Sequence, residues 1–203
     1  MSTAPTPLVH IVDDDEAIRD SLSFMFATSG VTARTYASPL ELLRSAGGLT
    51  SGCIVTDVRM PEMDGIELVR RLGQGGCRLP VIVMTGHGDV PMAVAAMKAG
   101  AVDFLEKPFD DETMLAAVKG ALSRVDRPAS PGLSPDVQQR LDSLSERERQ
   151  VLDGLVEGKL NKIIAYELGI SPRTVEIYRA KLMSKMEAPT FADLIRMVLG
   201  GRA

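Results

Sequence analysis

The sequence predicts two parts of different fold class. The first is an α/β fold with a doubly wound, five-stranded parallel sheet, and the second is a smaller, all-helical part. In residues 1–125, short apolar runs alternate with amphipathic stretches of helical spacing. These apolar runs lack the polar–apolar alternation of strands that face water on one side. Residues 143–199 show helical patterns and no strand-like run, so we expect helices alone there.

Five short runs mark the expected strands. They span residues 8–12, 32–37, 53–56, 81–84 and 102–105. Stretches with apolar residues at helical spacing follow them, at residues 15–29, 39–45, 65–72, 91–98 and 112–124. The second helix has a clear start, because Ser38 can cap it and Pro39 occupies the tolerated first position. Strands that alternate with helices in this way are typical of a parallel sheet wrapped by helices.

A proline-rich segment separates the two parts. Residues 127–141 contain Pro128, Pro131 and Pro135 together with Gly132 and two serines. Such a composition is typical of a short, semi-stiff linker. We therefore expect one domain over residues 1–125, a linker over 126–142 and a second domain over 143–203. Whether the linker is a rigid helix or a flexible tether stays open.

Four helices are expected in the second domain. Ser145-Glu-Arg-Glu148 matches a capping box, so a helix should follow it to about residue 156. Ser171-Pro172 is a strong start signal, with a capping serine before a proline at the first helical position. The other three helices are expected at residues 160–168, 172–186 and 190–199.

Composition excludes several classes of protein. Hydrophobic residues make up 45% of the chain and charged residues 25%, as in ordinary folded proteins rather than disordered ones. No run approaches ~18 apolar residues, and residues 1–7 lack the charge and apolar core of a signal peptide. Cys53 and Cys77 are too few for a disulfide scaffold or a structural zinc site. We therefore expect a cytoplasmic protein with reduced thiols and no membrane contact.

Charge is divided unevenly between the two parts. Residues 1–126 carry 17 acidic and 11 basic side chains, a net charge of −6. Residues 127–203 carry 10 acidic and 12 basic side chains, a net charge of +2. This asymmetry suggests two modules with different partners.

Polar side chains stand where the predicted strands end. Asp13 and Asp14 follow the first strand, while Asp57, Thr85 and Lys107 end the third, fourth and fifth. The carboxyl ends of parallel strands meet at one edge of the sheet, where ligands bind. Clustered carboxylates favour Mg²⁺, and a carboxylate beside the metal can attack phosphorus. A hydroxyl group and an ammonium group suit the phosphoryl oxygens of such a reaction.

Residues 8–122 resemble a two-component receiver domain. The motifs that carry the resemblance are Ile11-Val-Asp-Asp-Asp15, Val55-Thr-Asp57-Val-Arg-Met-Pro61, Asp64-Gly65, Thr85-Gly-His-Gly88 and Lys107-Pro108-Phe109. The resemblance implies a flavodoxin-like fold in which Asp57 accepts a phosphoryl group from a sensor histidine kinase. It also implies Mg²⁺ bound by Asp14, Asp57 and the main-chain carbonyl of Arg59, with Asp13 acting largely through water.

The same resemblance implies a two-state switch. Phosphorylation would draw in Thr85 and vacate space into which Phe104 turns. Many receivers have tyrosine at the Phe104 position, and phenylalanine lacks the hydroxyl, so the switch would depend on packing. A plain core role for Phe104 stays open. The Lys107–Pro108 bond is expected to be cis, and His10 is expected to have a core or edge role.

A competing class with an aspartate nucleophile is the haloacid dehalogenase type of phosphatase. Those enzymes carry a second aspartate two residues after the nucleophile, as a general acid. Arg59 occupies that position here, and an arginine cannot donate a proton at neutral pH. The sequence therefore favours a phosphoacceptor, with self-catalysed transfer and slow autodephosphorylation, over a turnover enzyme.

The second domain contains the pattern of a helix-turn-helix. Residues 158–187 carry six basic and three acidic side chains. A short helix, a glycine turn and a capped second helix form the motif, whose second helix enters the major groove of DNA. On that helix Val175, Tyr178 and Leu182 share one stripe and are predicted to be core.

A second stripe of the same helix is predicted to face the groove. It consists of Arg173, Glu176, Ile177 and Ala180. Glu176 would accept a hydrogen bond from a cytosine amine, and Ile177 would contact a thymine methyl group. Phosphate contacts are expected from Lys162, Thr174, Arg179, Lys181 and Lys185.

The second domain resembles the LuxR-type four-helix DNA-binding domain. The matching strings are Leu144-Ser-Glu-Arg-Glu-Arg-Gln-Val151, Asn161-Lys-Ile-Ile-Ala165 and Ile170-Ser-Pro-Arg-Thr-Val-Glu176. With both halves considered, nearly the whole chain is similar to the FixJ-type response regulators. Thr85-Gly-His-Gly-Asp-Val-Pro-Met-Ala93 supports that narrower match.

These resemblances imply a transcription regulator controlled by phosphorylation. Its partners would be a sensor histidine kinase, promoter DNA, RNA polymerase and, on phosphorylation, a second copy of the chain. The alternative is a DNA-binding or interaction protein whose pocket works unphosphorylated. The kinase, the signal, the promoters and the choice between activation and repression stay open, and so does the pathway, whether nitrogen fixation, oxygen response or another.

Overall fold

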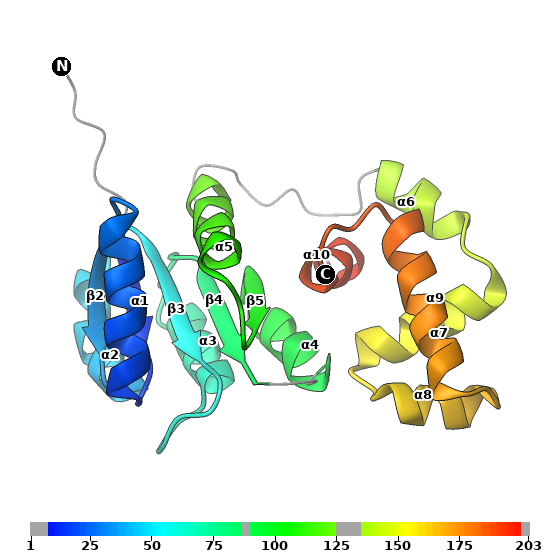
Figure 1. Ribbon diagram of the computed structural model, residues 1–203, viewed down its shortest axis with the longest axis horizontal. Helices are drawn as coiled ribbons and strands as arrows, with labels where there is room; N and C mark the ends of the chain where they lie inside the picture. Colours follow the sequence, from blue (N-terminus) through cyan, green and yellow to red (C-terminus); the bar gives the residue numbers. More distant parts are fainter. Residues whose placement is uncertain (1–7, 87–89, 125–134, 200–203) are drawn as a thin grey trace. The chain divides into compact units, whose positions relative to one another are not determined.

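The computed structural model describes residues 8–86, 90–124 and 135–199 of the chain. The described residues form an α/β part and a helical part (Figure 1). Among them, no helix is long and apolar enough to cross a membrane. The elements of the α/β part are, in chain order, β1 (Leu8–Val12), α1 (Glu16–Thr28), β2 (Thr32–Tyr36), α2 (Pro39–Ser45), the 3₁₀ turn η1 (Ala46–Gly48), β3 (Cys53–Asp57), α3 (Gly65–Gln74), β4 (Val81–Thr85), α4 (Val90–Ala99), β5 (Asp103–Glu106) and α5 (Asp111–Arg124).

The five strands form one sheet in the order β2-β1-β3-β4-β5, and every neighbouring pair is parallel. This arrangement confirms the predicted doubly wound sheet. The register places Val12 beside Thr56 on β3, and Thr85 beside Glu106 on β5. Asp13 and Asp57 therefore leave neighbouring strands at the same edge of the sheet.

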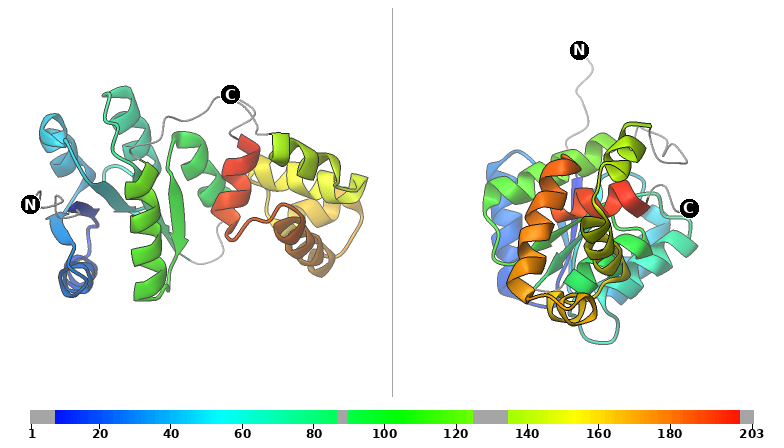
Figure 2. Two further views of the ribbon diagram at one scale, coloured as in Figure 1. Left: turned by 90° about the horizontal axis from the view of Figure 1, so that it is seen from above. Right: turned by 90° about the vertical axis from the view of Figure 1, so that its right-hand side faces the viewer.

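Helices cover both faces of the sheet. α1 and α5 lie on one face, and α2 and α3 lie on the other (Figure 2). The first face buries a continuous apolar cluster made of Val9, Ile11, Leu22, Met25, Phe26, Cys53, Val55, Ile82, Met84, Leu105, Met114, Ala117, Val118 and Ala121. Burial on both faces explains why the strand sequences lack alternation.

Several local predictions for this part are confirmed. The side chain of Ser38 accepts a hydrogen bond from the amide of Glu41 at 3.2 Å, at the start of α2. The Lys107–Pro108 peptide bond is cis. His10 is buried, and its ring nitrogens lie 3.1 Å from the hydroxyl of Tyr36 and 3.3 Å from the carbonyl oxygen of Ser51. Cys53 is buried and Cys77 is half-buried.

The helical part contains α6 (Pro135–Asp142), α7 (Glu146–Glu157), α8 (Asn161–Leu168), α9 (Pro172–Lys185) and α10 (Phe191–Leu199). The capping box at Ser145 and Glu148 is present, and Ser171 caps α9 with Pro172 in its first turn, as predicted. Helices α7, α8 and α9 pack against one another, and α10 packs on α7. The buried core of this part includes Val151, Leu152, Leu155, Ile164, Val175, Leu182, Leu194 and Ile195.

The turn between α8 and α9 depends on a glycine. Gly169 has a φ of 65°, in the left-handed region that glycine adopts without strain. Its amide donates to the carbonyl of Ala165, four residues back on α8. The turn allows α9 to pack across α8, which completes the predicted helix-turn-helix.

The sequence leaves the conformation of the linker over residues 126–142 open, and in the structure the second half of that segment is the helix α6. Arg140 of α6 donates to the main-chain carbonyl of Met186 at 2.8 Å and pairs with Glu187 at 2.9 Å, both just beyond α9. Arg149 of α7 donates to the carbonyl of Leu141 at 2.6 Å. α6 therefore belongs to the helical part, and residues 126–134 of the expected linker lie outside the described residues.

Candidate functional site

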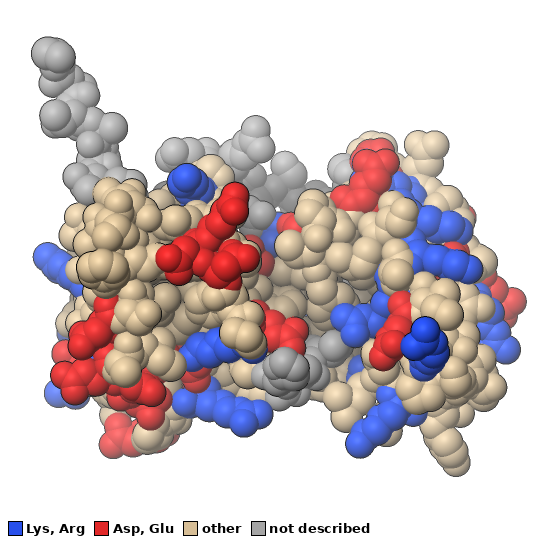
Figure 3. Space-filling view, viewed as in Figure 1, with Lys and Arg blue, Asp and Glu red and all other residues tan. Residues whose placement is uncertain are grey.

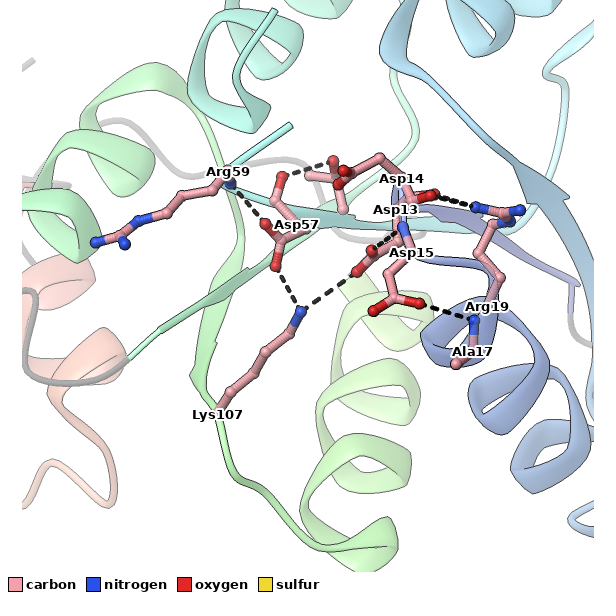
Figure 4. A network of polar contacts seen from close by, with 9 residues as sticks. Asp13, Asp14, Asp15, Ala17, Arg19, Asp57, Arg59 and Lys107 are labelled. Atoms are coloured by element: carbon pink, nitrogen blue, oxygen red, sulfur yellow. Dashed lines mark hydrogen bonds and ion pairs between the residues drawn. The ribbon is translucent and has the colours of Figure 1, made fainter. Parts of the chain in front are cut away.

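Lys107 joins two buried carboxylates at the carboxyl edge of the sheet. Its Nζ lies 2.5 Å from Oδ1 of Asp57 and 3.3 Å from Oδ2 of Asp13. Asp13 is 2% exposed and Asp57 is 9% exposed, although neither belongs to the apolar core. Figure 4 shows the three side chains pointing toward one another, with Asp13 just after β1, Asp57 at the end of β3 and Lys107 just after β5. The structure therefore brings these three predicted residues together.

The segment after β3 fixes the position of Asp57. The amide of Arg59 donates to Oδ2 of Asp57 at 2.5 Å, so the side chain is held from two sides. Gly65 begins α3, and its amide donates to the carbonyl of Val58 at 2.9 Å. A Cβ atom at Gly65 would lie far inside contact distance of the Asp57 carbonyl oxygen. Asp64-Gly65 therefore allows α3 to start directly against the strand end.

Two residues that the sequence reasoning missed position the loop after β1. Asp15 caps α1 through the amide of Ala17 at 2.9 Å, and the amide of Asp15 donates to Oδ1 of Asp13 at 3.0 Å. Arg19 donates through Nη1 to the main-chain carbonyls of Asp13 and Asp14, at 2.8 and 3.0 Å. The only sequence signal for Arg19 is its place one helical turn after the capping Asp15.

The charges of the pocket are out of balance. Burial raises the pKa of Asp13, and the nearby charge of Asp57 adds to this effect against the opposing hydrogen bond from Asp15 and charge of Lys107. Burial alone would lower the pKa of Lys107, but its hydrogen bond to Asp57 and the charges of both carboxylates outweigh burial and raise it. One ammonium group thus faces two carboxylates. Acidic side chains also gather at the lower left of Figure 3, where α1 begins.

Thr85 and Phe104 lie on neighbouring strands near this edge. Thr85 is buried, and its hydroxyl donates to the carbonyl of Gly86 at 3.3 Å. Phe104 is half-buried and pairs in register with Val83, two residues before Thr85 on β4. Side chains two residues apart on a strand share a face, so Phe104 lies on the Thr85 side of the sheet.

The remaining predicted pocket residues are Asp14 and Arg59. Asp14 is exposed at the rim, and the Arg59 side chain extends away from Lys107 in Figure 4. The described residues contain no group of three or more Asp, Glu, His or Cys side chains gathered around one point suited to a metal. The oxygen donors that are present, with the surplus negative charge of Asp13 and Asp57, nevertheless fit the preference of Mg²⁺ for hard ligands.

The helix-turn-helix presents its predicted groove-facing stripe to solvent. All four side chains of this stripe on α9 are exposed, and Ile177 is 51% exposed despite being apolar. Val175 and Leu182 on the opposite stripe are fully buried, and Tyr178 is half-buried. The exposed residues are Arg173, Glu176, Ile177 and Ala180.

The predicted phosphate-contacting residues differ in their surroundings. Lys162 is exposed, and the Thr174 hydroxyl lies 2.8 Å from that of Ser171 at the start of α9. The guanidinium of Arg179 lies 4.9 Å from the ring centroid of Phe191, and Nζ of Lys181 lies 5.7 Å from that of Tyr178. Figure 3 shows basic side chains spread over this part of the chain, with acidic ones among them.

Lys185 has a structural partner. Its Nζ lies 2.7 Å from Oε2 of Glu148, a carboxylate that is 4% exposed and that also belongs to the capping box of α7. The hydrogen bonds from Lys185 and from the amide of Ser145 lower the pKa of Glu148 to about 2. This pair ties the end of α9 to the start of α7, a role for Lys185 that the sequence reasoning missed.

Two family matches cover most of the chain. Residues 9–119 match the response regulator receiver domain, and residues 142–198 match the bacterial regulatory proteins of the luxR family. The receiver match alone spans more than half of the 203 residues, so it identifies the α/β part independently of the match in the helical part.

Relatives match over nearly the full length. The transcriptional regulatory protein FixJ of Azorhizobium caulinodans is 52% identical and that of Rhizobium meliloti 51%, covering 94% and 95% of this chain and 91% and 95% of theirs. A crystal structure of full-length FixJ from B. japonicum is 46% identical, with a TM-score of 0.58 and 96% of both chains covered. The chain therefore belongs to the FixJ-type response regulators, with a receiver domain and a LuxR-type DNA-binding domain.

Proposed function

We propose that Asp57 accepts a phosphoryl group from a sensor histidine kinase and that the modified chain regulates transcription at promoter DNA. The observation that supports this most directly is the contact of Lys107 with both Asp13 and Asp57 at the carboxyl edge of the sheet. In the transfer, a carboxylate oxygen of Asp57 forms a bond to phosphorus while the bond between phosphorus and the kinase histidine nitrogen breaks.

The pocket residues would share the work of the transfer. Lys107 neutralises negative charge on a phosphoryl oxygen, and the amide of Arg59 orients the Asp57 carboxylate. Asp14, Asp57 and the main-chain carbonyl of Arg59 would hold Mg²⁺, with Asp13 contributing through water. The metal supplies positive charge to the phosphoryl oxygens. Water would later attack the same phosphorus, which breaks its bond to the Asp57 oxygen and slowly releases inorganic phosphate, so the chain would act as a phosphoacceptor and not as a turnover enzyme.

Phosphorylation would be passed on through β4 and β5. Thr85 moves its hydroxyl from the Gly86 carbonyl to a phosphoryl oxygen, which takes its side chain toward Asp57. The space it leaves is on the side of the sheet that Phe104 shares, so the ring of Phe104 turns inward. A receiver domain over residues 1–125 would then form a homodimer with a second copy.

The DNA-binding domain, residues 143–203 together with α6, would insert α9 into the major groove. Arg173, Glu176, Ile177 and Ala180 meet base edges, and their exposure supports this assignment. Phosphate contacts come from Lys162, Thr174, Arg179 and Lys181. We assign Lys185 to the fold instead, because Glu148 already holds its ammonium. A bound dimer would present a surface to RNA polymerase.

The chemistry is tested by intact mass measurement. The chain is incubated with a small phosphodonor and Mg²⁺, and we expect a mass gain of one phosphoryl group. The Asp57→Asn variant should show no gain, whereas Asp20→Asn, which removes an exposed aspartate of α1, should gain as the wild type does. Equal labelling of the Asp57→Asn variant, or no labelling of the wild type, would contradict the proposed phosphoacceptor.

The coupling to DNA is tested separately. Duplexes selected by the wild-type chain from a randomised pool should bind more tightly after phosphodonor treatment, and Asp57→Asn should remove that increase. Binding that is strong and indifferent to the phosphodonor would favour a phosphorylation-independent DNA-binding protein.

A further inference from the structure

We propose that Phe191 positions Arg179 for contact with a DNA phosphate. This inference rests on the proposed DNA-binding function and extends it to a residue outside the helix-turn-helix. Phe191 is the first residue of α10, and Arg179 is on the second half of α9. The Arg179 guanidinium carbon lies 4.9 Å from the centroid of the Phe191 ring, within the range of a cation–π contact.

The contact lies beside the predicted groove-facing stripe. A shallow cavity of about 260 Å³ is lined by Glu176, Arg179, Ala180, Met183 and Phe191. Glu176 and Ala180 belong to the groove-facing stripe, and Met183 follows one turn later. The Phe191 ring therefore forms one wall of a hollow at the edge of the surface that would meet DNA, and Arg179 lies at the same edge.

An arginine at the edge of a DNA-binding surface binds a phosphate more tightly when a neighbouring group already holds its side chain in place. Its long side chain has many rotamers in solution, and binding a phosphate requires one of them, which costs conformational entropy. A planar guanidinium can stack on an aromatic face and still present N–H groups at its rim to a phosphate. The ring thus restricts the Arg179 side chain before binding through contact with the face of its guanidinium.

Phe191 is suited to this role by its position in the fold. The residues that follow it in α10 include Ala192, Leu194 and Ile195, which are buried and anchor the helix. Phe191 itself is only half-buried at the helix start. A residue needed for the core alone would be expected inside the anchored stripe, whereas a supporting ring must stand at the surface.

The test measures affinity and salt dependence together, with the full chain and a duplex that the wild type selects from a randomised pool. Arg179→Ala should weaken binding and make the slope of log K against log salt shallower by about 0.9, the value for one phosphate contact. Phe191→Leu should weaken binding about two- to fivefold, as expected for an exposed cation–π contact. Its slope should stay that of the wild type, because the charge of Arg179 is still present.

Two further variants separate positioning from structure. Phe191→Tyr keeps the aromatic face and should restore wild-type affinity. The double variant Phe191→Leu/Arg179→Ala should bind no more weakly than Arg179→Ala alone, because the ring acts through the arginine. Phe24→Leu, at an exposed aromatic residue of α1, is the matched control and should bind as the wild type does.

Each outcome has a distinct meaning. Additive losses in the double variant, a loss in Phe191→Tyr equal to that in Phe191→Leu, or wild-type binding by Phe191→Leu would overturn the positioning role and leave DNA binding intact. Failure of the wild type to enrich any duplex would instead overturn the proposed function, and the positioning role with it. Circular dichroism of each variant verifies that the helices are retained.

Discussion

Both parts of the molecule contain a buried carboxylate paired with a lysine, and the two pairs differ in their balance of charge. In the receiver domain, Lys107 faces both Asp57 and Asp13. In the DNA-binding domain, Lys185 faces Glu148 alone, and the amide of Ser145 also donates to this carboxylate. The first site therefore has two carboxylates for one ammonium group, and the second has one carboxylate for one ammonium group.

The pKa shifts follow this difference. Burial raises the pKa of Asp13, so its charge is poorly compensated, whereas the pKa of Glu148 falls to about 2 because Lys185 and Ser145 stabilise the carboxylate. A site with surplus negative charge is stabilised by a bound cation. A site whose charges are paired is not stabilised further by a cation, and the ion pair of Glu148 with Lys185 holds α7 and α9 together. The comparison separates a chemical site from a structural one by charge balance rather than by residue type.

The largest effect is expected from a substitution at Gly65, where α3 packs directly against the strand end that carries Asp57. In Gly65→Ala, the new Cβ would collide with the Asp57 main-chain oxygen, so the start of α3 must shift away from β3. We expect a loss of about 2 kcal/mol in the free energy of unfolding of the receiver domain, within the usual range for overpacking. Urea unfolding measures this loss, and phosphodonor labelling should fall with it.

Gly73→Ala is the matched control, because a Cβ atom at Gly73 of the same helix meets nothing within 4 Å. Its unfolding free energy should be unchanged or slightly raised, as alanine favours a helix. If Gly65→Ala were as stable and as readily labelled as Gly73→Ala, the close packing of α3 against the strand end would have no role in positioning Asp57.

A smaller effect is expected from Mg²⁺, and it should act on one site only. At a free concentration of ten times its dissociation constant, a bound ion stabilises the folded state by about 1.4 kcal/mol. We expect hydrogen exchange to slow in β3 and the loop after β1, and to stay unchanged in α7. Asp57→Asn should reduce the effect in the receiver domain. Equal slowing in α7 would contradict the distinction between the two sites.

The sequence indicated the unbalanced site well and the matched one poorly, for a physical reason. In a parallel sheet, strand ends meet at one edge, so Asp13, Asp57 and Lys107 could be brought together from their positions alone. The pairing of Glu148 with Lys185 depends on how α7 and α9 cross. Helical periodicity gives the buried face of each helix but not where two helix ends meet, so the sequence does not predict the contact of Lys185 with Glu148.

The helix α6 shows a different reason for a missed element. Pro135 at its first position is the same start signal that correctly predicted α9 at Pro172. The surrounding prolines and serines outweighed it, and α6 has a single buried residue, Leu141, to give it a pattern. Its place is fixed by Arg140 and its contacts beyond α9, which a local reading of the sequence does not contain.

A still smaller effect, about 1 kcal/mol, is expected from Glu148→Gln, which removes the charge that receives Lys185 and weakens the capping box. The pH dependence gives the sharper measurement. Because the folded pKa of Glu148 lies below the ordinary 4.5, its contribution is complete above about pH 4.5 and is lost as the pH falls toward about 2. Urea unfolding of the DNA-binding domain should show this loss, and Glu148→Gln should flatten it. If stability fell with pH in the variant as it does in the wild type, the pair of Glu148 and Lys185 would not stabilise the DNA-binding domain.

The smallest effect on stability is expected from His10, a buried residue of the receiver domain. Its ring nitrogens lie within hydrogen-bond distance of Tyr36 and Ser51. Burial lowers the pKa of His10 below 6.5, and the charge of Arg34 acts in the same direction. The folded state therefore resists the proton that the unfolded chain accepts, so stability is complete above about pH 6.5 and declines as the pH falls below it. His10→Gln keeps hydrogen-bonding groups for Tyr36 and Ser51 but cannot titrate, and its urea unfolding should depend less on pH between 7.5 and 5. An equal dependence in the variant would show that His10 does not cause the decline, and Asp13 could not cause it either, because a raised carboxyl pKa stabilises the folded state as the pH falls.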